Sequence, residues 1–360
     1  MAVPATASAA STWEVQSTPN LPGAAGNFLN AVFCPSTTSC FAVGDGINNA
    51  DSTLVENWNG SIWTAQSTPS PSGAYDEQLD AISCASTTMC MAVGQYLNSS
   101  SGPQVTLAEE WNGARWAFLS PPNPSTGGTT LEGVSCSSPT TCIAVGWYLG
   151  PYGNDSYTLA EFWNGSKWER QVDRQPPGPV SNQLSAISCT SFRHCIAVGQ
   201  HGYGVALIEN WNGTAWSVVG DPKSAGLTQG SDLQSISCAS SSNCTAVGTW
   251  TPKESEALAM YWNGSNWVVQ NTAVLRNSFD SDLTGVSCAS TEQCTAVGAK
   301  PSGTSGDSVT LAEGWNGSKW IVEPTANPGT SMAFLGVSCF LSATCTAVGY
   351  YDNSTLAERN

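Results

Sequence analysis

Basic residues are scarce in this chain. Eleven Lys and Arg and two His stand against twenty-seven Asp and Glu, which gives a formal net charge of −16. A protein that reads nucleic acid needs a basic surface for the phosphate backbone, and binding to an anionic membrane needs the same sign of charge. The composition therefore argues against both nucleic acid and membrane surfaces as partners.

Long apolar runs, helical periodicity and catalytic motifs are also missing. No stretch approaches the roughly 18–20 apolar residues that span a bilayer, and the amino-terminal MAVPATASAAS lacks the basic and apolar regions of a signal peptide. No Gly-x-Ser-x-Gly motif accompanies His201, so a Ser-His-Asp hydrolase is a minor alternative. We expect a protein that is not an enzyme and needs no cofactor.

Cysteine, by contrast, is abundant and regularly spaced. The fourteen cysteines form seven pairs with five residues between partners, and successive pairs begin 49 to 53 residues apart. The pairs are Cys34/Cys40, Cys84/Cys90, Cys136/Cys142, Cys189/Cys195, Cys238/Cys244, Cys288/Cys294 and Cys339/Cys345.

The spacing within each pair decides between three chemistries. Redox motifs and structural zinc sites use closer spacings. Two cysteines at this spacing can face each other across a hairpin, where a Cα–Cα distance of about 4.5–5.5 Å suits a disulfide. The pattern therefore predicts seven disulfides and a secreted, extracellular protein.

Each cysteine pair belongs to a repeat of about fifty residues, with units starting near 29, 79, 131, 184, 233, 283 and 334. Ala-Val-Gly follows the second cysteine, and a segment such as TLAEEWNG (106–113) and a further tryptophan come later. This pattern predicts four short strands per unit, which we call a, b, c and d. The Asn-Gly between strands c and d predicts a type I′ turn, in which both central residues have positive φ.

Seven units of four strands predict an all-β, seven-bladed β-propeller that forms a single domain over residues 1–360. The first tryptophan of the strand-d type lies in STWEVQS, at about 11–17, ahead of the first cysteine unit. The chain ends on TLAERN, a strand c with no strand d after it. We therefore expect the amino-terminal strand to complete the last blade as its outermost strand, in a monomer whose ring has no open edge.

Residues present in nearly every blade are expected to serve the fold. Thirteen of the fifteen tryptophans belong to the repeat, and we interpret them as packing between blades rather than as a sugar-binding lattice. The strand-c glutamate, replaced by Met260 in the fifth unit, is expected to accept hydrogen bonds from backbone N–H groups of turns. It occurs as Glu56, Glu109, Glu161, Glu209, Glu313 and Glu358.

Function is expected on the face that carries the variable loops, because loops on a rigid scaffold are where binding residues concentrate. Aromatic residues outside the repeat are predicted in the b–c loops, at Tyr96, Trp147, Tyr148, Tyr152, Tyr203, Trp250, Tyr350 and Tyr351. They form a protein- or sugar-binding surface if exposed, and cover the blade ends if buried. No metal site is predicted, although Asp45, Asn48, Asn49 and Asp51, or Asp280 and Asp282, leave calcium as an alternative.

The repeated phrase, seen as LDAISCASTTMCMAVG (79–94) followed by TLAEEWNGARW (106–116), resembles the dispase autolysis-inducing protein family of secreted actinobacterial seven-bladed propellers. The resemblance covers the whole chain and rests on scaffold residues. It implies a secreted non-enzyme that binds extracellular metalloproteases and promotes their autolysis. It also implies a glutamine-donor substrate for a transglutaminase, with Gln95, Gln104 and Gln200, on loops expected to be exposed, as the candidate donors.

Two other functional classes remain open from the sequence. A carbohydrate-binding lectin is the first, and propeller lectins usually repeat their sugar site in each blade. A glycan hydrolase or lyase is the second, and it requires clustered carboxylates with shifted pKa values at the mouth of the central channel.

Overall fold

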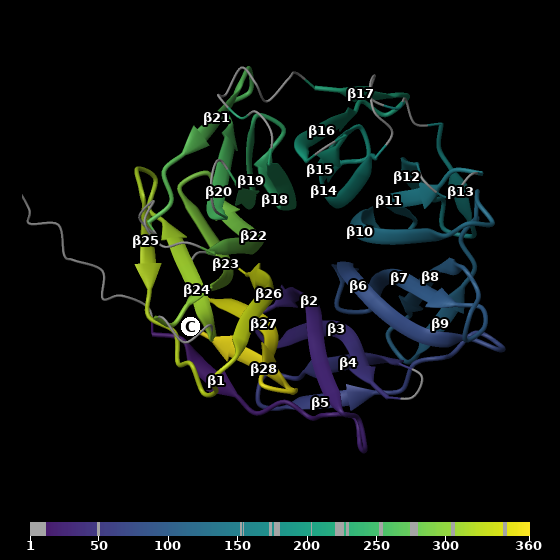
Figure 1. Cartoon of the computed structure of the whole chain (residues 1–360), viewed down its shortest axis with the longest axis horizontal. Helices are drawn as coiled ribbons and strands as arrows, with labels where there is room; N and C mark the ends of the chain where they lie inside the picture. Colours follow the sequence, from purple (N-terminus) through teal and green to yellow (C-terminus); the bar gives the residue numbers. More distant parts are fainter. Residues whose placement is uncertain are drawn as a thin grey trace, which may run out of the picture.

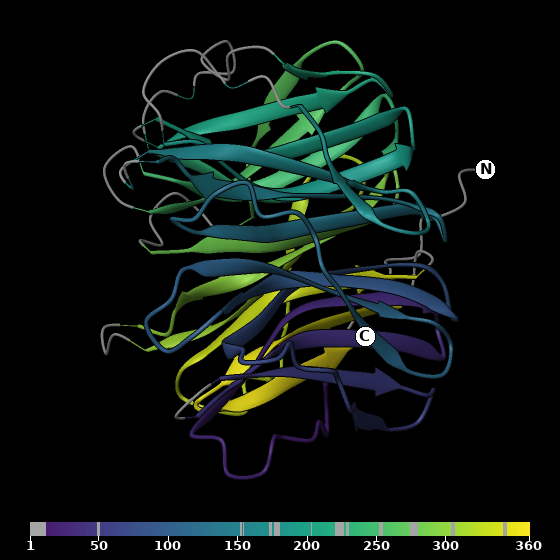
Figure 2. The ribbon, with the colours of Figure 1, turned by 90° about the vertical axis from the view of Figure 1, so that its right-hand side faces the viewer.

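The computed structural model describes residues 12–48, 51–151, 153, 155–172, 175, 181–202, 204–219, 227, 230–251, 255–273, 280–303, 307–340 and 344–360. Seven four-stranded antiparallel sheets surround a common axis (Figure 1) and form a disk when seen from the side (Figure 2). The predicted seven-bladed propeller is confirmed. No helix long and apolar enough to cross a membrane occurs among these residues.

The blades are numbered 1 to 7 by their cysteine pairs. Strand a, nearest the axis, is β2 (Gly26–Ser36), β6 (Tyr75–Ser86), β10 (Thr129–Ser138), β14 (Gln183–Ser191), β18 (Ser231–Ser240), β22 (Asp282–Ser290) and β26 (Met332–Cys339). Strand b is β3 (Ser39–Ile47), β7 (Met89–Leu97), β11 (Thr141–Leu149), β15 (His194–His201), β19 (Asn243–Trp250), β23 (Gln293–Pro301) and β27 (Cys345–Tyr351).

The outer half of each blade consists of strands c and d. Strand c is β4 (Ser52–Trp58), β8 (Gln104–Trp111), β12 (Ser156–Trp163), β16 (Val205–Trp211), β20 (Glu256–Trp262), β24 (Ser308–Trp315) and β28 (Ser354–Arg359). Strand d is β5 (Trp63–Gln66), β9 (Trp116–Leu119), β13 (Trp168–Arg170), β17 (Trp216–Val218), β21 (Trp267–Gln270), β25 (Trp320–Glu323) and, for blade 7, β1 (Glu14–Gln16).

The ring closes through the two ends of the chain, as predicted. The sheet of blade 7 has the order β1-β28-β27-β26, with Val15 opposite Glu358. In Figure 1 the purple β1 lies beside the yellow β28. The Trp13 indole N–H also donates to Glu323 of blade 6, at 2.8 Å. The amino-terminal segment therefore completes blade 7 through β1 and contacts blade 6 through Trp13.

All seven predicted disulfides are present, and each joins strand a to strand b of one blade. The bonds are Cys34–Cys40, Cys84–Cys90, Cys136–Cys142, Cys189–Cys195, Cys238–Cys244, Cys288–Cys294 and Cys339–Cys345. Because the strands are antiparallel, the a–b and c–d connections share one side of the disk, which we call the stapled face. The b–c and d–a connections share the other side, which we call the variable face.

The geometry of the disulfides differs from the expectation in one respect. Their Cα–Cα distances are 3.9 to 4.0 Å, so the expected range of about 4.5–5.5 Å is wrong and the two strands approach more closely. In blade 2, Cys84 lies directly opposite Cys90 in the ladder. The close approach holds strands a and b together at the stapled face.

The second cysteine of each pair is buried in its blade. In blade 2, Cys90 also lies opposite Trp111 of strand c, so neighbours on both sides cover it. These second cysteines, 0–6% exposed, are Cys40, Cys90, Cys142, Cys195, Cys244, Cys294 and Cys345. They are therefore core residues of the scaffold, in agreement with their prediction as structural disulfides.

A serine beside the disulfide joins neighbouring blades. The backbone N–H of Cys136 donates to Ser83 Oγ of the preceding blade, and Cys189 donates likewise to Ser135, both at 3.0 Å. The same contact occurs at six of the seven blade interfaces. Blade 1 has Phe33 at the serine position, so this bond cannot form between blades 1 and 2. The repeated Ser-Cys dipeptide thus serves packing between blades as well as the disulfide.

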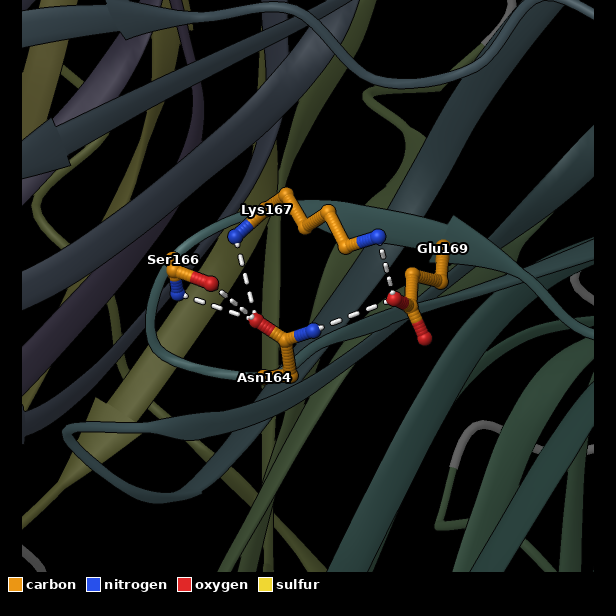
Figure 3. Close-up of polar contacts among 4 residues, drawn as sticks. All are labelled: Asn164, Ser166, Lys167 and Glu169. Carbon is orange, nitrogen blue, oxygen red and sulfur yellow. Dashed lines mark hydrogen bonds and ion pairs between the residues drawn. The ribbon is translucent and has the colours of Figure 1, made fainter.

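The Asn-Gly signal correctly predicts a c–d hairpin, but the expected type I′ turn is wrong. In blade 3 the turn spans residues 164–167, and only its glycine, Gly165, has positive φ. The side-chain oxygen of Asn164 accepts the backbone N–H groups of Ser166 and Lys167, at 3.0 and 3.1 Å (Figure 3). The asparagine therefore shapes a four-residue turn through its side chain rather than through a left-handed backbone.

The repeat tryptophans pack, as predicted. Trp163 and Trp168 of blade 3 are 4% and 5% exposed, with ring centroids 5.8 Å apart. The strand-c glutamates are fully buried, and the predicted backbone contact is confirmed for Glu313 and Glu358. In blades 1 to 3 the corresponding carboxyl groups have no hydrogen-bond partner among the described residues.

Candidate functional site

Six of the eight predicted aromatic residues lie in the described strands, and all six are partly buried. They are Tyr96, Trp147, Tyr148, Trp250, Tyr350 and Tyr351. Tyr152 and Tyr203 lie outside the described residues. The predicted loop placement of the six is wrong, because strand b continues past Ala-Val-Gly and includes them.

Most of these aromatic side chains contact their own blade or the next. The Tyr148 ring stacks on Tyr157 with centroids 5.4 Å apart, and Tyr350 lies edge-on to Phe28 at 5.1 Å. Trp250 packs against the core of blade 5. These contacts match the alternative in which the aromatic residues cover the blade ends.

The three candidate glutamine donors also lie in strands rather than exposed loops. Gln95 is in β7, Gln104 in β8 and Gln200 in β15, and all three are partly buried. Gln200 Nε2 donates to Gln183 Oε1 at 3.3 Å. The loop placement fails because strands b and c are longer than their repeated residues indicate.

A β-bulge recurs in strand a of every blade and turns one side chain per blade toward the axis. In blade 2 the register shifts between Leu79 and Ala81, so Asp80 is the extra residue. Gly94 lies opposite Leu79, and a Cβ there would overlap the Gln78 carbonyl oxygen, which explains the glycine of Ala-Val-Gly. The bulge residues are Asn30, Asp80, Glu132, Ser185, Gln234, Thr284 and Leu335.

These seven residues and the two after each of them line a central cavity of about 170 Å³. The backbone position repeats around the ring, whereas its side chain differs in every blade. The bulge ring is therefore the place where a symmetric scaffold presents an asymmetric set of groups.

A larger cavity of about 330 Å³, which we call the channel-mouth cavity, opens beside this ring at the variable-face ends of blades 2 to 4. Its lining consists of Gln78, Asp80, Gln95, Gln104, Thr130, Glu132, Trp147 and Ser185. Gln78 Nε2 donates to Asp80 Oδ1 at 2.8 Å, and Trp147 Nε1 donates to Glu132 Oε1 at 2.6 Å. Trp147 is thus the predicted aromatic residue that reaches this cavity.

The titratable groups that line the channel-mouth cavity are two carboxyl groups, Asp80 and Glu132. Burial raises the pKa of Asp80 well above its usual range, and the nearby carboxyl groups of Glu132 and Asp45 raise it further. Burial also raises the pKa of Glu132, although the Trp147 hydrogen bond opposes that shift. Burial raises the pKa of Asp45, at the end of β3, to about 6. No Lys, Arg or His is among the described residues that line the cavity.

A second cavity, of about 240 Å³, lies between blades 4 and 5 on the stapled face. Its walls include the Trp262 and Trp267 rings, whose centroids are 5.8 Å apart, together with His194, Ile196 and Asn210. Trp267 is partly exposed, whereas the other strand-d tryptophans are 3–6% exposed. Partly exposed indole rings with polar neighbours are suited to stacking against a sugar or an aromatic group.

The structure gives no support to the calcium alternative in the part of the chain that it describes. No group of three or more His, Cys, Asp or Glu side chains there is placed to hold a metal ion. Asp45 instead accepts a hydrogen bond from Asn30 Nδ2 at 3.2 Å, and Asn49 lies outside the described residues.

Comparison with known proteins gives the fold. The chain matches no family model and no curated protein sequence. A structure of YCF48 bound to D1 peptide superposes with a TM-score of 0.60 at 11% identity, over 96% of this chain and 94% of that one. YCF48 from Cyanidioschyzon merolae gives 0.60 at 12% identity, over 97% and 98%. The RRP9 WD40 repeats give 0.59 at 10% identity, over 96% of each chain. The shared feature is the propeller.

Sequence reasoning missed the carboxylates of the channel-mouth cavity. Asp80 and Glu132 stand in short strands that read as alternating, and their bulge depends on pairing with strand b. One signal was available: the position after the strand-a leucine is chemically different in each repeat while both neighbours stay nearly constant. A residue that varies between two nearly constant neighbours is not required for packing of the blade, and is therefore a candidate for function.

Proposed function

We propose that this chain is a secreted, non-enzymatic propeller that binds another protein through the channel-mouth cavity. The observation that carries the proposal is the convergence of two carboxylates, three amides and Trp147 in one open cavity on the variable face. One similar propeller is described with a bound peptide, which gives a precedent for this use of the fold. Seven disulfides support an extracellular location.

The more specific part of the proposal concerns the partner. From the sequence resemblance we propose a secreted metalloprotease whose autolysis the chain promotes. The test incubates the intact protein with a secreted neutral metalloprotease, and follows complex formation by pull-down and protease lifetime by residual activity. We expect a complex and a shorter lifetime, both reduced in the Asp80→Asn/Glu132→Gln variant. An unchanged lifetime together with no complex would reject this partner.

The transglutaminase part needs a separate test, because Gln95, Gln104 and Gln200 are partly buried in strands. An acyl-donor glutamine must enter an enzyme cleft in an extended form, so we propose that labelling requires local opening at the variable face. Transglutaminase labelling with a tagged amine, read by peptide mass spectrometry, identifies the donors. Labels confined to other glutamines would remove these three from the proposal.

Carbohydrate binding is the second candidate function, and the stapled-face cavity favours it. The cavity lies between blades 4 and 5 and contains a partly exposed tryptophan pair, so we propose a single sugar site there rather than one site in each blade. A glycan array with the native protein and a Trp267→Ala variant tests it. Hits that disappear in the variant would support a lectin, and an array without hits would reject it.

A glycan hydrolase or lyase is the third candidate. The required carboxylates with raised pKa values do occur at the channel mouth, in Asp80 and Glu132. Hydrolysis of a polysaccharide panel that is lost in Glu132→Gln would establish this class and replace the non-enzymatic proposal.

A further inference from the structure

We infer that the channel-mouth cavity is a receptor for a cationic side chain, and specifically for an arginine guanidinium presented by the partner protein. The inference rests on the proposed function, since it assigns a chemistry to the same contact. The cavity combines two carboxyl groups, a glutamine oxygen without a donor among the described residues and an indole ring, and a guanidinium can contact all of them.

Two carboxyl groups, and no cationic side chain among the described residues, line the channel-mouth cavity. Asp80 and Glu132 come from neighbouring blades and enter the cavity through the bulges of their strands. No cationic side chain lines the cavity, so the described residues provide no counter-ion there. The Glu132 carboxyl group raises the pKa of Asp80, and a cation that binds between the two would stabilise both as anions. The chain as a whole, at −16, attracts such a ligand rather than an anionic one.

The second observation concerns an acceptor that the protein leaves unused. Gln95 lines the cavity, and its Oε1 atom is buried with no hydrogen-bond partner among the described residues. A buried carbonyl oxygen without a donor costs free energy in the empty protein. Together with the Asp80 and Glu132 carboxyl groups, which only accept hydrogen bonds when ionised, it favours a ligand that carries several N–H donors and no acceptor. Among natural side chains, the arginine guanidinium has five such donors in one plane.

Hydrogen bonds from neighbouring side chains hold the two carboxyl groups in place, which also favours a guanidinium as the ligand. The Trp147 N–H holds one oxygen of Glu132 at 2.6 Å, and the Gln78 amide holds one oxygen of Asp80 at 2.8 Å. The Gln78 amide thus holds Asp80, and the Trp147 indole and the Ser185 side chain hold Glu132, so both carboxyl groups are fixed in the cavity wall. The Trp147 ring lines the same cavity, and an indole adds cation–π attraction for a guanidinium within about 6 Å.

The experiment uses three small probes of matched shape: the N-acetyl amides of arginine, lysine and citrulline. Citrulline replaces the guanidinium by a neutral urea of nearly equal size. Binding to the intact, disulfide-bonded protein is measured by calorimetric titration and by ligand-observed NMR. We expect the arginine probe to bind at least tenfold more tightly than the citrulline probe, and the preference to fall as salt is raised.

Variants then locate the site. Asp80→Asn/Glu132→Gln should weaken the arginine probe at least tenfold. It removes buried charge without changing shape, so the propeller should persist, as shown by seven intact disulfides and an unchanged circular dichroism spectrum. The matched control is Glu292→Gln, which removes one exposed carboxylate from the a–b turn of blade 6 on the stapled face. It should leave binding within twofold.

The outcomes separate this inference from the proposed function. Equal binding of the arginine and citrulline probes, unchanged binding in the double variant, or no binding at millimolar concentration would overturn it. Equal binding of the lysine and arginine probes would overturn the guanidinium assignment. If the arginine probe binds as expected but no protein partner is captured, the proposed function fails while the cation site stands. If a protein partner binds the native protein and the double variant equally well, the proposed function is supported and the cation site is rejected.

Discussion

The Glu358 carboxylate accepts a hydrogen bond from the backbone N–H of Ala326, with an Oε2 to N distance of 3.1 Å. Glu313 has the same relationship to Ala273, at 2.9 Å. In both cases the donor lies in the connection that enters the blade, six positions after the strand-d tryptophan of the preceding blade. This bond anchors each incoming connection to a fully buried carboxyl group.

The same position is proline in the connections that precede blades 1, 2 and 3. Pro19, Pro69 and Pro122 precede blades 1, 2 and 3, and proline has no N–H to donate. In the described part of these blades both glutamate oxygens lack a hydrogen-bond partner, at Glu56, Glu109 and Glu161. Burial raises the pKa of Glu56 to about 9, and burial with the nearby Glu77 raises the pKa of Glu109 to about 8. These side chains are therefore neutral in the folded protein near pH 7.

The first prediction is that the protein loses stability as the pH rises. Below about pH 4.5 these carboxyl groups are protonated in both states. Above it they ionise in the unfolded chain alone, so the free energy of unfolding falls by up to about 1.4 kcal/mol per pH unit for each group. The fall ends near pH 8 for Glu109 and near pH 9 for Glu56.

Denaturant unfolding at pH 5, 7 and 9, with the disulfides intact, measures this effect. Glu109→Gln should flatten the pH dependence, because it removes one titrating group, and Glu292→Gln on the surface should not. A free energy of unfolding that stays constant or increases from pH 5 to 9 would contradict the prediction.

The second prediction restores the missing donor. Pro69→Ala supplies a backbone N–H at the position of Ala326 in blade 7, and we expect the Glu109 pKa to fall because the new bond favours the carboxylate. Carboxyl-carbon NMR of Glu109 measures the shift. Pro71→Ala, two residues later in the same connection, is the control for lost chain stiffness. Identical Glu109 titrations in the two variants would show that proline is not the cause.

The third prediction concerns the serine contacts between blades. Ser135→Ala removes the acceptor for the Cys189 N–H and should lower the free energy of unfolding by about 1 kcal/mol. Chemical denaturation measures the change. The exposed Ser137, two residues away, provides the control, and Ser137→Ala should change stability by only a few tenths of a kcal/mol. Equal effects of the two substitutions would show that the contact adds no stability.

The fourth prediction is that the disulfides act locally. Replacing Cys84 and Cys90 by alanine opens a loop with a sequence separation of 6, which should cost about 2 kcal/mol in the chain-entropy model. The propeller should remain folded, and limited proteolysis should first cut near the a–b turn of blade 2. Cleavage spread evenly over all blades would instead indicate that the disulfide supports the whole ring.

Repetition made the scaffold predictable. One Cys-(five)-Cys phrase is ambiguous, but seven copies fix the number of blades, and an unmatched strand at each end fixes the closure. The disulfides follow because a cysteine pair at this spacing lies opposite in an a–b hairpin, as Cys84 and Cys90 do. These features depend on contacts within one unit, so the sequence of that unit contains the necessary information.

The candidate site was not predictable in the same way. Asp80, Glu132 and Trp147 belong to different strands, and a one-residue bulge decides which way the two carboxylates point. A bulge is a property of the pairing between strands, so the variable position after the strand-a leucine marks the residue but not the direction of its side chain. The ends of strand b, which include Gln95 and Trp147, extend past the repeated Ala-Val-Gly, and their side chains differ from blade to blade, so the repeat does not mark them as strand residues.

The pairing of β1 with β28 determines the order in which the molecule can be assembled. β1 is synthesised before its partner β28, so six blades and their disulfides can form while the seventh lacks its outer strand. In a chain shortened at its amino end, β28 would present unpaired N–H and C=O groups to the solvent. Such an edge recruits strands from other molecules. By pairing with β28, β1 thus covers the edge through which a folded propeller would otherwise associate with other molecules.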